Sequence, residues 1–335
     1  MSADSIAATT ADNSVSPKVI SVQFRDVEEA ALHVPERTVY SQLTRGPLEG
    51  VLHSYIISPQ SSFSIAKTNR SIRKQFEVGA DHLRMGFHWD HTGRAKCCAN
   101  GMRLEQHEAS ANLPGTPIDL HFGENHEGCW ISLDYQPVLR LLTWQEEEAS
   151  VLREPGRLVA SGCTRHLLHS VIAAGRIELF GPGSRAPQTS LISAFEKGLF
   201  AFAAYALSSA FGRNIDLGRA SATHRGRLLR KACDVIDAKA SEGLTISALC
   251  LSVGASRRSL ETIFAEGLNV SPYQYVLAVR FNAIRKALLS EEHAGCSIGD
   301  IVSRWGIWHL SRFAEDYRKM FGELPSQTRT SALRK

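Results

Sequence analysis

The 335-residue chain lacks the features that mark secreted or membrane-spanning proteins. Its seven cysteines are odd in number and form no C-x-x-C pair, which argues against a disulfide framework and against a structural zinc site. It has no run of about 18 consecutive apolar residues, so we expect no transmembrane helix. A basic segment followed by an apolar run is also missing at the N-terminus, so we expect no secretory signal and a cytoplasmic location.

The chain also lacks the short motifs of several enzyme classes. It contains no phosphate-binding loop, no dinucleotide-binding glycine fingerprint and no nucleophile elbow. The stretches His88–His91 and His121–Cys129 hold plausible metal ligands, but not the tight two-histidine motif with a downstream carboxylate and third histidine. Exposed or internally hydrogen-bonded histidines explain them more simply. We expect no catalytic residue, no metal and no cofactor, and tightly bound metal in purified protein would revive an enzyme interpretation.

Charge is unevenly distributed along the chain. The net charge is only +4, yet residues 225–335 hold 17 Lys and Arg against 11 Asp and Glu, an excess of six positive charges. The remaining residues hold 21 Lys and Arg against 23 Asp and Glu. A basic C-terminal region suits contact with DNA phosphates, which supply much of the affinity of DNA-binding proteins. An excess of this size also arises by chance, so it is weak support alone.

One pattern occurs twice in the basic region, over Thr245–Tyr275 and again over Ser297–Thr328. Each copy has apolar residues at helical spacing, then a glycine, then a second apolar helical face. Gly254 and Gly306 suit the left-handed position that ends a helix, and Ser256 suits the start of the next one. Two such copies predict a pair of helix-turn-helix units. The alternative for a single copy is an ordinary helical hairpin; the duplication and the basic outer faces favour DNA binding.

The same region resembles the DNA-binding domain of the AraC/XylS family of transcription regulators, over roughly residues 225–332. The resemblance lies in the residues Gly267, Ser271-Pro272, Tyr275, Arg280-Phe281, Leu288-Leu289, Ile298, Ile301-Val302, Trp305-Gly306-Ile307, Phe313, Tyr317-Arg318, Phe321-Gly322 and Pro325-Ser326. Ile307 and Thr328 replace aromatic residues that are common in the family, which we interpret as conservative changes in packing. The variant around Trp305–His309 and Phe321–Ser326 resembles the subgroup that includes ethanolamine-utilisation regulators.

The resemblance implies which side chains meet DNA. It places the first reading helix at Arg257–Phe264 and the second at His309–Tyr317, held about one DNA turn, roughly 34 Å, apart by the helix containing Tyr275–Leu289. Arginine can donate hydrogen bonds to guanine, and glutamate can accept a hydrogen bond from cytosine. Some arginines contact only phosphates, which position the protein without reading the sequence. We expect DNA contacts from Arg257, Arg258, Glu261, Thr262, His309, Ser311, Arg312 and Glu315.

The region before the repeats is expected to be β-rich to about residue 133 and helical afterwards. Short apolar or alternating runs separated by Gly, Pro and Asn favour a sandwich or barrel. Helical spacing follows over Gln136–Ala149, Arg165–Ala174 and Gln188–Phe211. The last segment is apolar over a broad surface, which suits either a buried helix within the domain or a dimerisation helix.

These segments predict an α+β protein with four parts. Residues 1–16 form a disordered tail and 17–211 a sensor or dimerisation domain, which by its resemblance is cupin-like with a helical extension. Residues 212–224 form a linker, and 225–332 an all-α DNA-binding domain with two helix-turn-helix motifs.

Two regulator functions remain open at this point, besides the less favoured interpretation as an enzyme fused to a DNA-binding domain. The favoured one is an effector-responsive transcription activator that binds promoter DNA and an unknown small molecule, contacts RNA polymerase and is able to form a homodimer. The other is a constitutive DNA-binding regulator whose N-terminal domain only mediates dimerisation. Neither the effector nor the target operon is evident from the sequence, because sensor pockets are assembled from distant residues.

Overall fold

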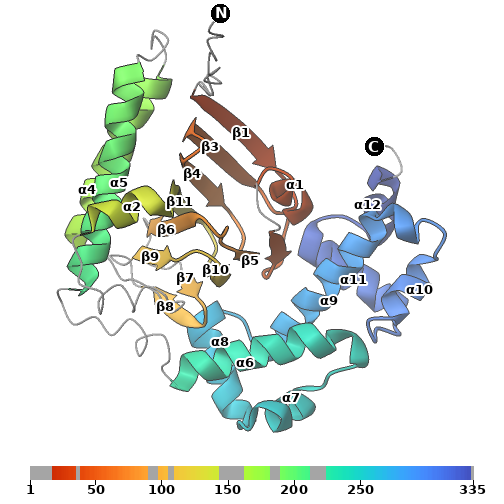
Figure 1. The fold of residues 1–335 in the computed structure, drawn as a ribbon. Coiled ribbons are helices and arrows are strands. Elements are labelled where there is room, and N and C mark those ends of the chain that lie inside the picture. The colour runs from red at the N-terminus through yellow and green to blue at the C-terminus, as the bar shows by residue number, and fades with distance from the viewer. Residues whose placement is uncertain are drawn as a thin grey trace, which may run out of the picture.

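A computed structural model of the protein describes residues 17–34, 38–89, 97–104, 109–142, 162–181, 189–211 and 224–332. The predicted tail and nearly all of the predicted linker, residues 212–223, lie outside these ranges. The described chain forms a β-rich N-terminal part, a pair of long helices beside it and a helical C-terminal part (Figure 1). The predicted α+β class, with sheets before a helical region, is confirmed.

Two antiparallel sheets make up the β-rich part. The larger has the order β1-β3-β4-β11-β6-β9 and the smaller the order β2-β5-β10-β7-β8. The strands are β1 (Lys18–Phe24), β2 (Val39–Gln42), β3 (Gly50–Ser58), β4 (Ser61–Thr68), β5 (Ile72–Glu77), β6 (His82–Trp89), β7 (Cys97–Ala99), β8 (Met102–Leu104), β9 (Ala109–Asn112), β10 (Pro117–Phe122) and β11 (His126–Asp134). A short helix, α1 (Val27–Ala31), follows β1.

The inner faces of the two sheets share one apolar cluster. Phe24 and Leu52 from the larger sheet join Ile72, Phe76 and Phe122 from the smaller one. Because successive side chains of a strand point to opposite faces, the immediate strand neighbours of these five residues point out of the sandwich. The fold therefore offers three surfaces: an interior between the sheets and two outer faces.

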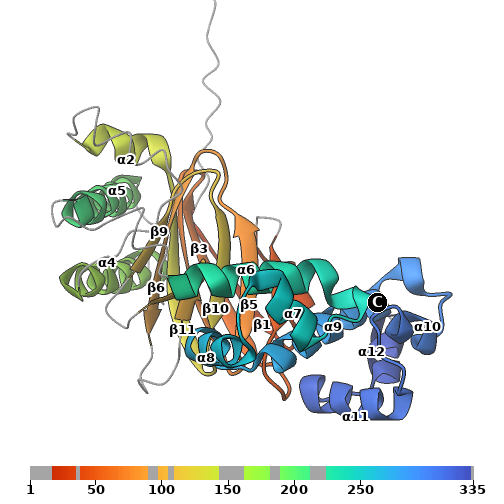
Figure 2. The same ribbon diagram turned by 90° about the horizontal axis from the view of Figure 1, so that it is seen from below.

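Helices cover the outer face of the larger sheet. These are α2 (Tyr135–Leu141), α4 (Gly162–Phe180) and α5 (Thr189–Phe211), which lie on one side of the sheets while the C-terminal helices lie on the other (Figure 2). Leu199, Ala203 and Leu207 of α5 are fully buried against Phe63 and Ile131 of the sheet. α4 continues past the predicted end at Ala174 to Phe180. Gly175 lets α5 pack closely there, because a Cβ atom at this position would lie 2.2 Å from the ring of Phe195.

α5 is a core helix on one face and exposed on the other. Its buried residues support the interpretation as a helix packed within its own domain, while Leu191 and Tyr205 are exposed. Length and composition alone would let Thr189–Ser208 cross a membrane, and 39% of its apolar window is buried inside the protein. Among the described residues this helix therefore qualifies the sequence expectation of no spanning segment, and its buried face packs on the larger sheet.

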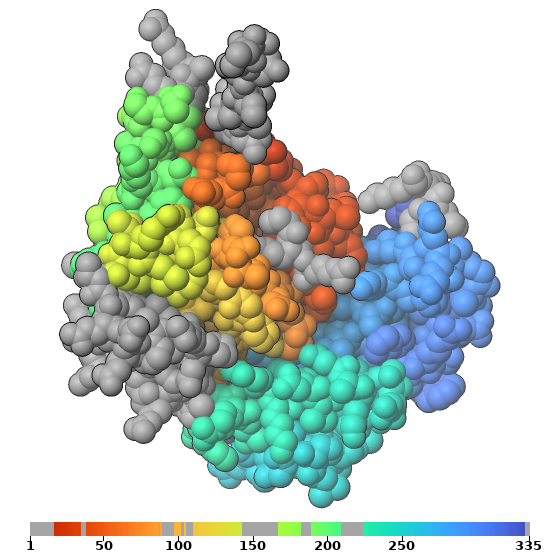
Figure 3. Space-filling model, viewed as in Figure 1, coloured from red at the N-terminus to blue at the C-terminus, as the bar shows by residue number. Residues whose placement is uncertain are grey.

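The C-terminal helices form a separate apolar core. They are α6 (His224–Lys239), α7 (Ile246–Val253), α8 (Arg257–Leu268), α9 (Pro272–Leu289), α10 (Ile298–Ser303), α11 (Leu310–Phe321) and α12 (Pro325–Ala332), with 3₁₀ turns at Ala240–Glu242 and Glu291–His293. Their buried residues come from every helix of the two repeats, and Leu43 and Cys98 of the N-terminal part join them. The surface view shows this part lying against the β-rich part along its lower right side (Figure 3).

Candidate nucleic-acid interface

The first repeat folds as its residues predict. α7 ends at Gly254, whose φ of 74° is the left-handed conformation that glycine adopts at little cost. Ser256 precedes α8 and its side chain accepts from the Ser259 N–H at 3.1 Å, which satisfies a donor that the helix leaves unpaired. Leu260, Ile263 and Phe264 are buried. The opposite face of α8 is thereby left to solvent.

The second repeat has the same core but a different helix start. Gly306 also has a left-handed φ, 69°, and Phe313 and Tyr317 of α11 are buried. His309 stands at the N-cap of α11 and makes no side-chain capping bond, unlike Ser256 before α8. The start of α11 therefore keeps its backbone donors available, at the end of the helix where phosphate oxygens bind well.

All eight side chains that we expected at DNA are exposed. They lie on the solvent faces of α8 and at the start and outer face of α11: Arg257, Arg258, Glu261, Thr262, His309, Ser311, Arg312 and Glu315. Figure 2 shows both helices along the same lower edge of the molecule. The structure thus brings the two groups to one side of the C-terminal part. Their contact with DNA remains a prediction.

Several of these side chains already have partners on their own helix. Arg257 Nε donates to Glu261 Oε1 at 2.9 Å, although the two side chains are 75% and 52% exposed. The Thr262 hydroxyl donates to the Arg258 carbonyl at 2.9 Å. Lys319 binds Glu315, and this hydrogen bond together with its positive charge lowers the pKa of the Glu315 carboxyl. Exposed pairs of this kind are weak, so they can be exchanged for contacts with bases or phosphates.

A buried arginine joins the smaller sheet to α6, the helix before the first repeat. Arg73, on the outer face of β5, donates to both carboxylate oxygens of Asp119 on β10, at 2.8 and 2.6 Å. Its other nitrogen donates to Asp237 of α6, at 2.6 and 2.9 Å. Burial alone would raise the pKa of Asp119, but His121 and Arg73 beside it hold that pKa below its ordinary value. Asp119 therefore stays ionised and the ion pair is retained.

The end of β2 binds the last turn of α11. Gln42 is buried, and its Nε2 donates towards the carbonyl oxygens of Thr44, Gly46 and Met320, at 2.7, 2.7 and 2.8 Å. The Gly46 N–H donates to the Lys319 carbonyl at 2.8 Å. The β-rich part thus satisfies carbonyl groups that the end of a helix leaves unpaired.

Two residues of α9 complete this contact between the parts. The Asn282 amide accepts from the Gln42 N–H at 2.9 Å and donates to its carbonyl at 2.8 Å. Arg285 meets Glu323 at 2.6 Å, Asp26 at 3.3 Å and Glu28 at 3.6 Å. The sequence gives no pairing for these residues. Its only signal is an asparagine and an arginine on an apolar helix, where a buried polar group needs a partner.

The structure brings together one histidine from each histidine-rich stretch, His88 and His126, and places His121 and Cys129 apart from this pair. His126 faces the interior of the sandwich, where its Nε2 lies 3.3 Å from Nδ1 of His88. His121 faces outwards from the smaller sheet, and its Nε2 lies 3.1 Å from Oδ1 of Asp119. Cys129 is buried between the larger sheet and the helices that cover it. Burial lowers the pKa of His88 to about 3, so this pair is uncharged at neutral pH. Among the described residues, which exclude Asp90 and His91, no three His, Cys, Asp or Glu side chains are grouped to hold a metal ion.

Comparison with known proteins places the repeats in a helix-turn-helix domain. The sequence model of a family described as "Helix-turn-helix domain" matches residues 249–331. A probable thc operon regulatory protein of Rhodococcus erythropolis is 35% identical over 100 residues, 30% of each chain. The XylDLEGF operon transcriptional activator of Pseudomonas putida is 40% identical over 73 residues, 22% of this chain and 23% of that protein.

These matches support the AraC/XylS family for the C-terminal domain, and they span less than a third of either relative. A crystal structure of the AraC-like transcriptional activator CuxR aligns with 85% of this chain and all of its own, at 16% identity and a TM-score of 0.42. Because this TM-score is low, the interpretation as an AraC/XylS-type domain rests on the C-terminal sequence match.

Proposed function

We propose that this chain is a sequence-specific, DNA-binding transcription regulator of the AraC/XylS type that places α8 and α11 in successive major grooves. The observation that carries the proposal is the duplicated, capped helix-turn-helix unit whose outer faces lie exposed on one side of the molecule. A helix anchored on one face and free on the other is what major-groove recognition requires.

The roles of the side chains follow from their chemistry. Arg258 and Arg312 have the donor geometry to read guanine, and Glu261 and Glu315 accept from cytosine once their own-helix partners are displaced. Arg257 and the free start of α11, with His309 and Ser311, suit phosphate oxygens. Thr262 lies one turn after Arg258 on α8, and its methyl group suits apolar contact with the methyl group of a thymine.

Within this proposal, residues 17–211 form a sensor domain and residues 225–332 the DNA-binding domain. The buried contacts of Arg73, Gln42 and Arg285 across the two parts support regulation of DNA binding from the sensor side. The proposed output is activation of transcription by a cytoplasmic protein, through RNA polymerase bound beside the site. Self-association through the exposed face of α4 and α5, which carries Ile177 and Tyr205, also belongs to the proposal.

The proposed subgroup is that of the ethanolamine-utilisation regulators. It is supported by the sequence Trp305-Gly306-Ile307-Trp308-His309, in which Trp308 is 76% exposed at the start of the second reading helix. An exposed tryptophan at that place is a chemical feature that a DNA or protein partner would cover.

The test is selection of bound fragments from genomic DNA by the purified full-length protein, followed by sequencing. We expect a few sites that share two short motifs about one turn apart, roughly 34 Å. Arg258→Ala should lose this selectivity, whereas Arg140→Ala should keep it, because Arg140 is exposed on α2, on the far side of the sheets (Figure 2). Binding without any shared motif, or equal loss in both variants, would overturn the proposal.

A further inference from the structure

The loop between β2 and β3 lies against the second reading helix and carries an arginine that the proposed function does not use. The Gly46 N–H donates to the Lys319 carbonyl at 2.8 Å. Pro47 lies so close to the end of α11 that a Cβ atom on Gly322 would come within 3.2 Å of it. These backbone contacts hold the loop in place immediately after Arg45.

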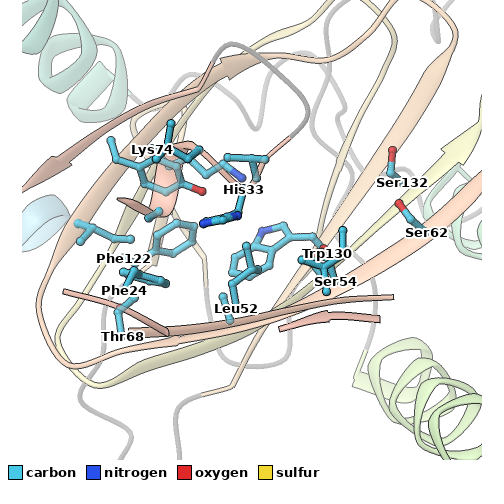
Figure 4. A pocket seen from close by; sticks show the side chains of 18 of the residues that line it. Phe24, His33, Leu52, Ser54, Ser62, Thr68, Lys74, Phe122, Trp130 and Ser132 are labelled. Carbon is cyan, nitrogen blue, oxygen red and sulfur yellow. Dashed lines mark hydrogen bonds between the residues drawn. The ribbon is translucent and has the colours of Figure 1, made fainter. Parts of the chain in front are cut away.

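The cations on this side of the β-rich part face in three different directions. Lys74 of β5 lines the cavity between the two sheets, whose volume is about 370 Å³ (Figure 4). Its neighbour Arg73 is buried against Asp119 and Asp237. Arg45, by contrast, keeps 58% of its side chain exposed. Arg45 is therefore within reach of a partner outside the molecule.

Arg45 lies beside one flank of α11. Its Nη2 is 3.6 Å from Oδ1 of Asp316, and Nε of Arg312 is 3.9 Å from Oδ2 of the same carboxylate. Arg312 belongs to the exposed face that we expect at the bases, whereas Phe313 and Tyr317 are buried. Asp316 is partly buried, so it marks the border between these two faces. The Arg45 guanidinium is thereby placed at the side of the reading face.

The side of a reading helix is where phosphates lie. An α-helix with its side chains is about 10–12 Å across and the major groove is about 12 Å wide, so the flanks of the helix face the backbones that border the groove. A guanidinium binds phosphate oxygens through charge-assisted N–H donors. The pair of Arg45 with Asp316 is exposed and therefore weak enough to be exchanged. Because the loop is already held, less ordering is needed when Arg45 binds.

We propose that Arg45 contacts a DNA phosphate at the rim of the groove that α11 enters, so that the DNA interface includes a residue of the β-rich part. This inference rests on the proposed function, in which α11 reads DNA. In the complex Arg45 also lies near the Asp316 carboxylate and offsets its repulsion of the phosphates. The contact adds affinity without reading bases, because phosphates are the same in every sequence.

The experiment is a fluorescence anisotropy titration of the full-length protein at several salt concentrations. The probes are the strongest fragment from the genomic selection and a scrambled duplex of the same length. Arg45→Ala should weaken binding of both probes by the same factor, about threefold to tenfold, and should reduce the slope of log affinity against log salt by about one. Arg45→Lys should restore most of the affinity, because lysine also binds phosphates.

Arg140→Ala is the matched control. It removes one positive charge as well, but from an exposed position on α2, on the far side of the sheets (Figure 2). It should change neither the affinity nor the salt slope. Thermal unfolding of each variant checks that the loss of binding by Arg45→Ala is not a loss of folding.

Asp316→Asn separates a phosphate contact from an effect inside the protein. Most of the loss caused by Arg45→Ala should persist when Asp316→Asn is also present. If the loss disappears in that background, Arg45 acts only by offsetting Asp316 and the proposal is wrong. Unchanged or tighter binding by Arg45→Ala, or weaker binding of the selected fragment alone, would also overturn it.

The same titration tells failure of this inference from failure of the proposed function. Equal binding of the selected fragment and the scrambled duplex by the unaltered protein would contradict sequence-specific regulation. Selective binding by the unaltered protein, together with full affinity in Arg45→Ala, would contradict the phosphate contact alone.

Discussion

The two helix-turn-helix units share one pattern of apolar residues and are held in different ways. In the first, α8 begins with a serine cap and ends at Asn269, in a left-handed conformation of its own. In the second, α11 begins without a side-chain cap, and its last turn is bound by Gln42 and Gly46 of the β-rich part. The β-rich part reaches the first unit through α6 and through the packing of β7 on α8, and it reaches the second through hydrogen bonds to the last turn of α11. The contact with the second unit therefore holds the backbone of α11 itself.

The largest effect is expected where the first unit joins the sheet. Arg73→Met removes the buried cation that binds both Asp119 and Asp237, and leaves His121 as the partner of Asp119 alone. The free energy of unfolding should fall by about 3–5 kcal/mol, because an uncompensated buried charge is costly. Chemical denaturation followed by circular dichroism measures it.

Arg45→Ala is the control on the second unit's side. Arg45 is 58% exposed and lies 3.6 Å from Asp316, so its loss should cost at most about 1 kcal/mol. An Arg73→Met protein as stable as Arg45→Ala would show that the buried pair does not hold the first unit.

A smaller effect is expected where the β-rich part caps α11. Gln42→Ala removes a buried donor that is shared by the carbonyl groups of Thr44, Gly46 and Met320, which should lower the free energy of unfolding by about 1–3 kcal/mol. It should also weaken protection of the DNA half that α11 reads more than the other half, as nuclease footprinting measures. Gln60→Ala, at an exposed turn between β3 and β4, should change neither quantity. Equal weakening of both halves would contradict the special position of the second unit.

The smallest effect separates the two helix starts. Ser256→Ala removes the capping bond of α8 and should cost about 1 kcal/mol of stability. His309→Ala removes no capping bond from α11, so thermal unfolding should be unchanged. If both substitutions destabilise equally, the difference in capping has no energetic weight.

The helical repeats were predictable because their determinants are local. Apolar spacing, Gly254 and Ser256 lie within a few residues of the structure that they specify, and the structure confirms each. Thr328, which we interpreted as a conservative change in packing, is buried. Its hydroxyl lies 3.0 Å from that of Tyr317, a polar contact that the local pattern does not predict.

The contacts between the parts and the cavity were beyond the sequence. Arg73 meets Asp119 and Asp237 from 46 and 164 residues away, and Gln42 meets Met320 from 278 residues away. The alternation of side chains along β5 predicts that Lys74 and Arg73 face opposite sides of the sheet, but it does not predict which residues each of them contacts. Such pairings depend on strand order, which one sequence does not reveal.

The most direct test of two reading helices is footprinting of one selected DNA site with Arg258→Ala and Arg312→Ala side by side. Each variant should lose about 1–3 kcal/mol of binding free energy and lose protection on one half of the site, a different half for each variant. Loss of the same half in both variants, or uniform weakening on cognate and random DNA alike, would contradict reading by α8 and α11.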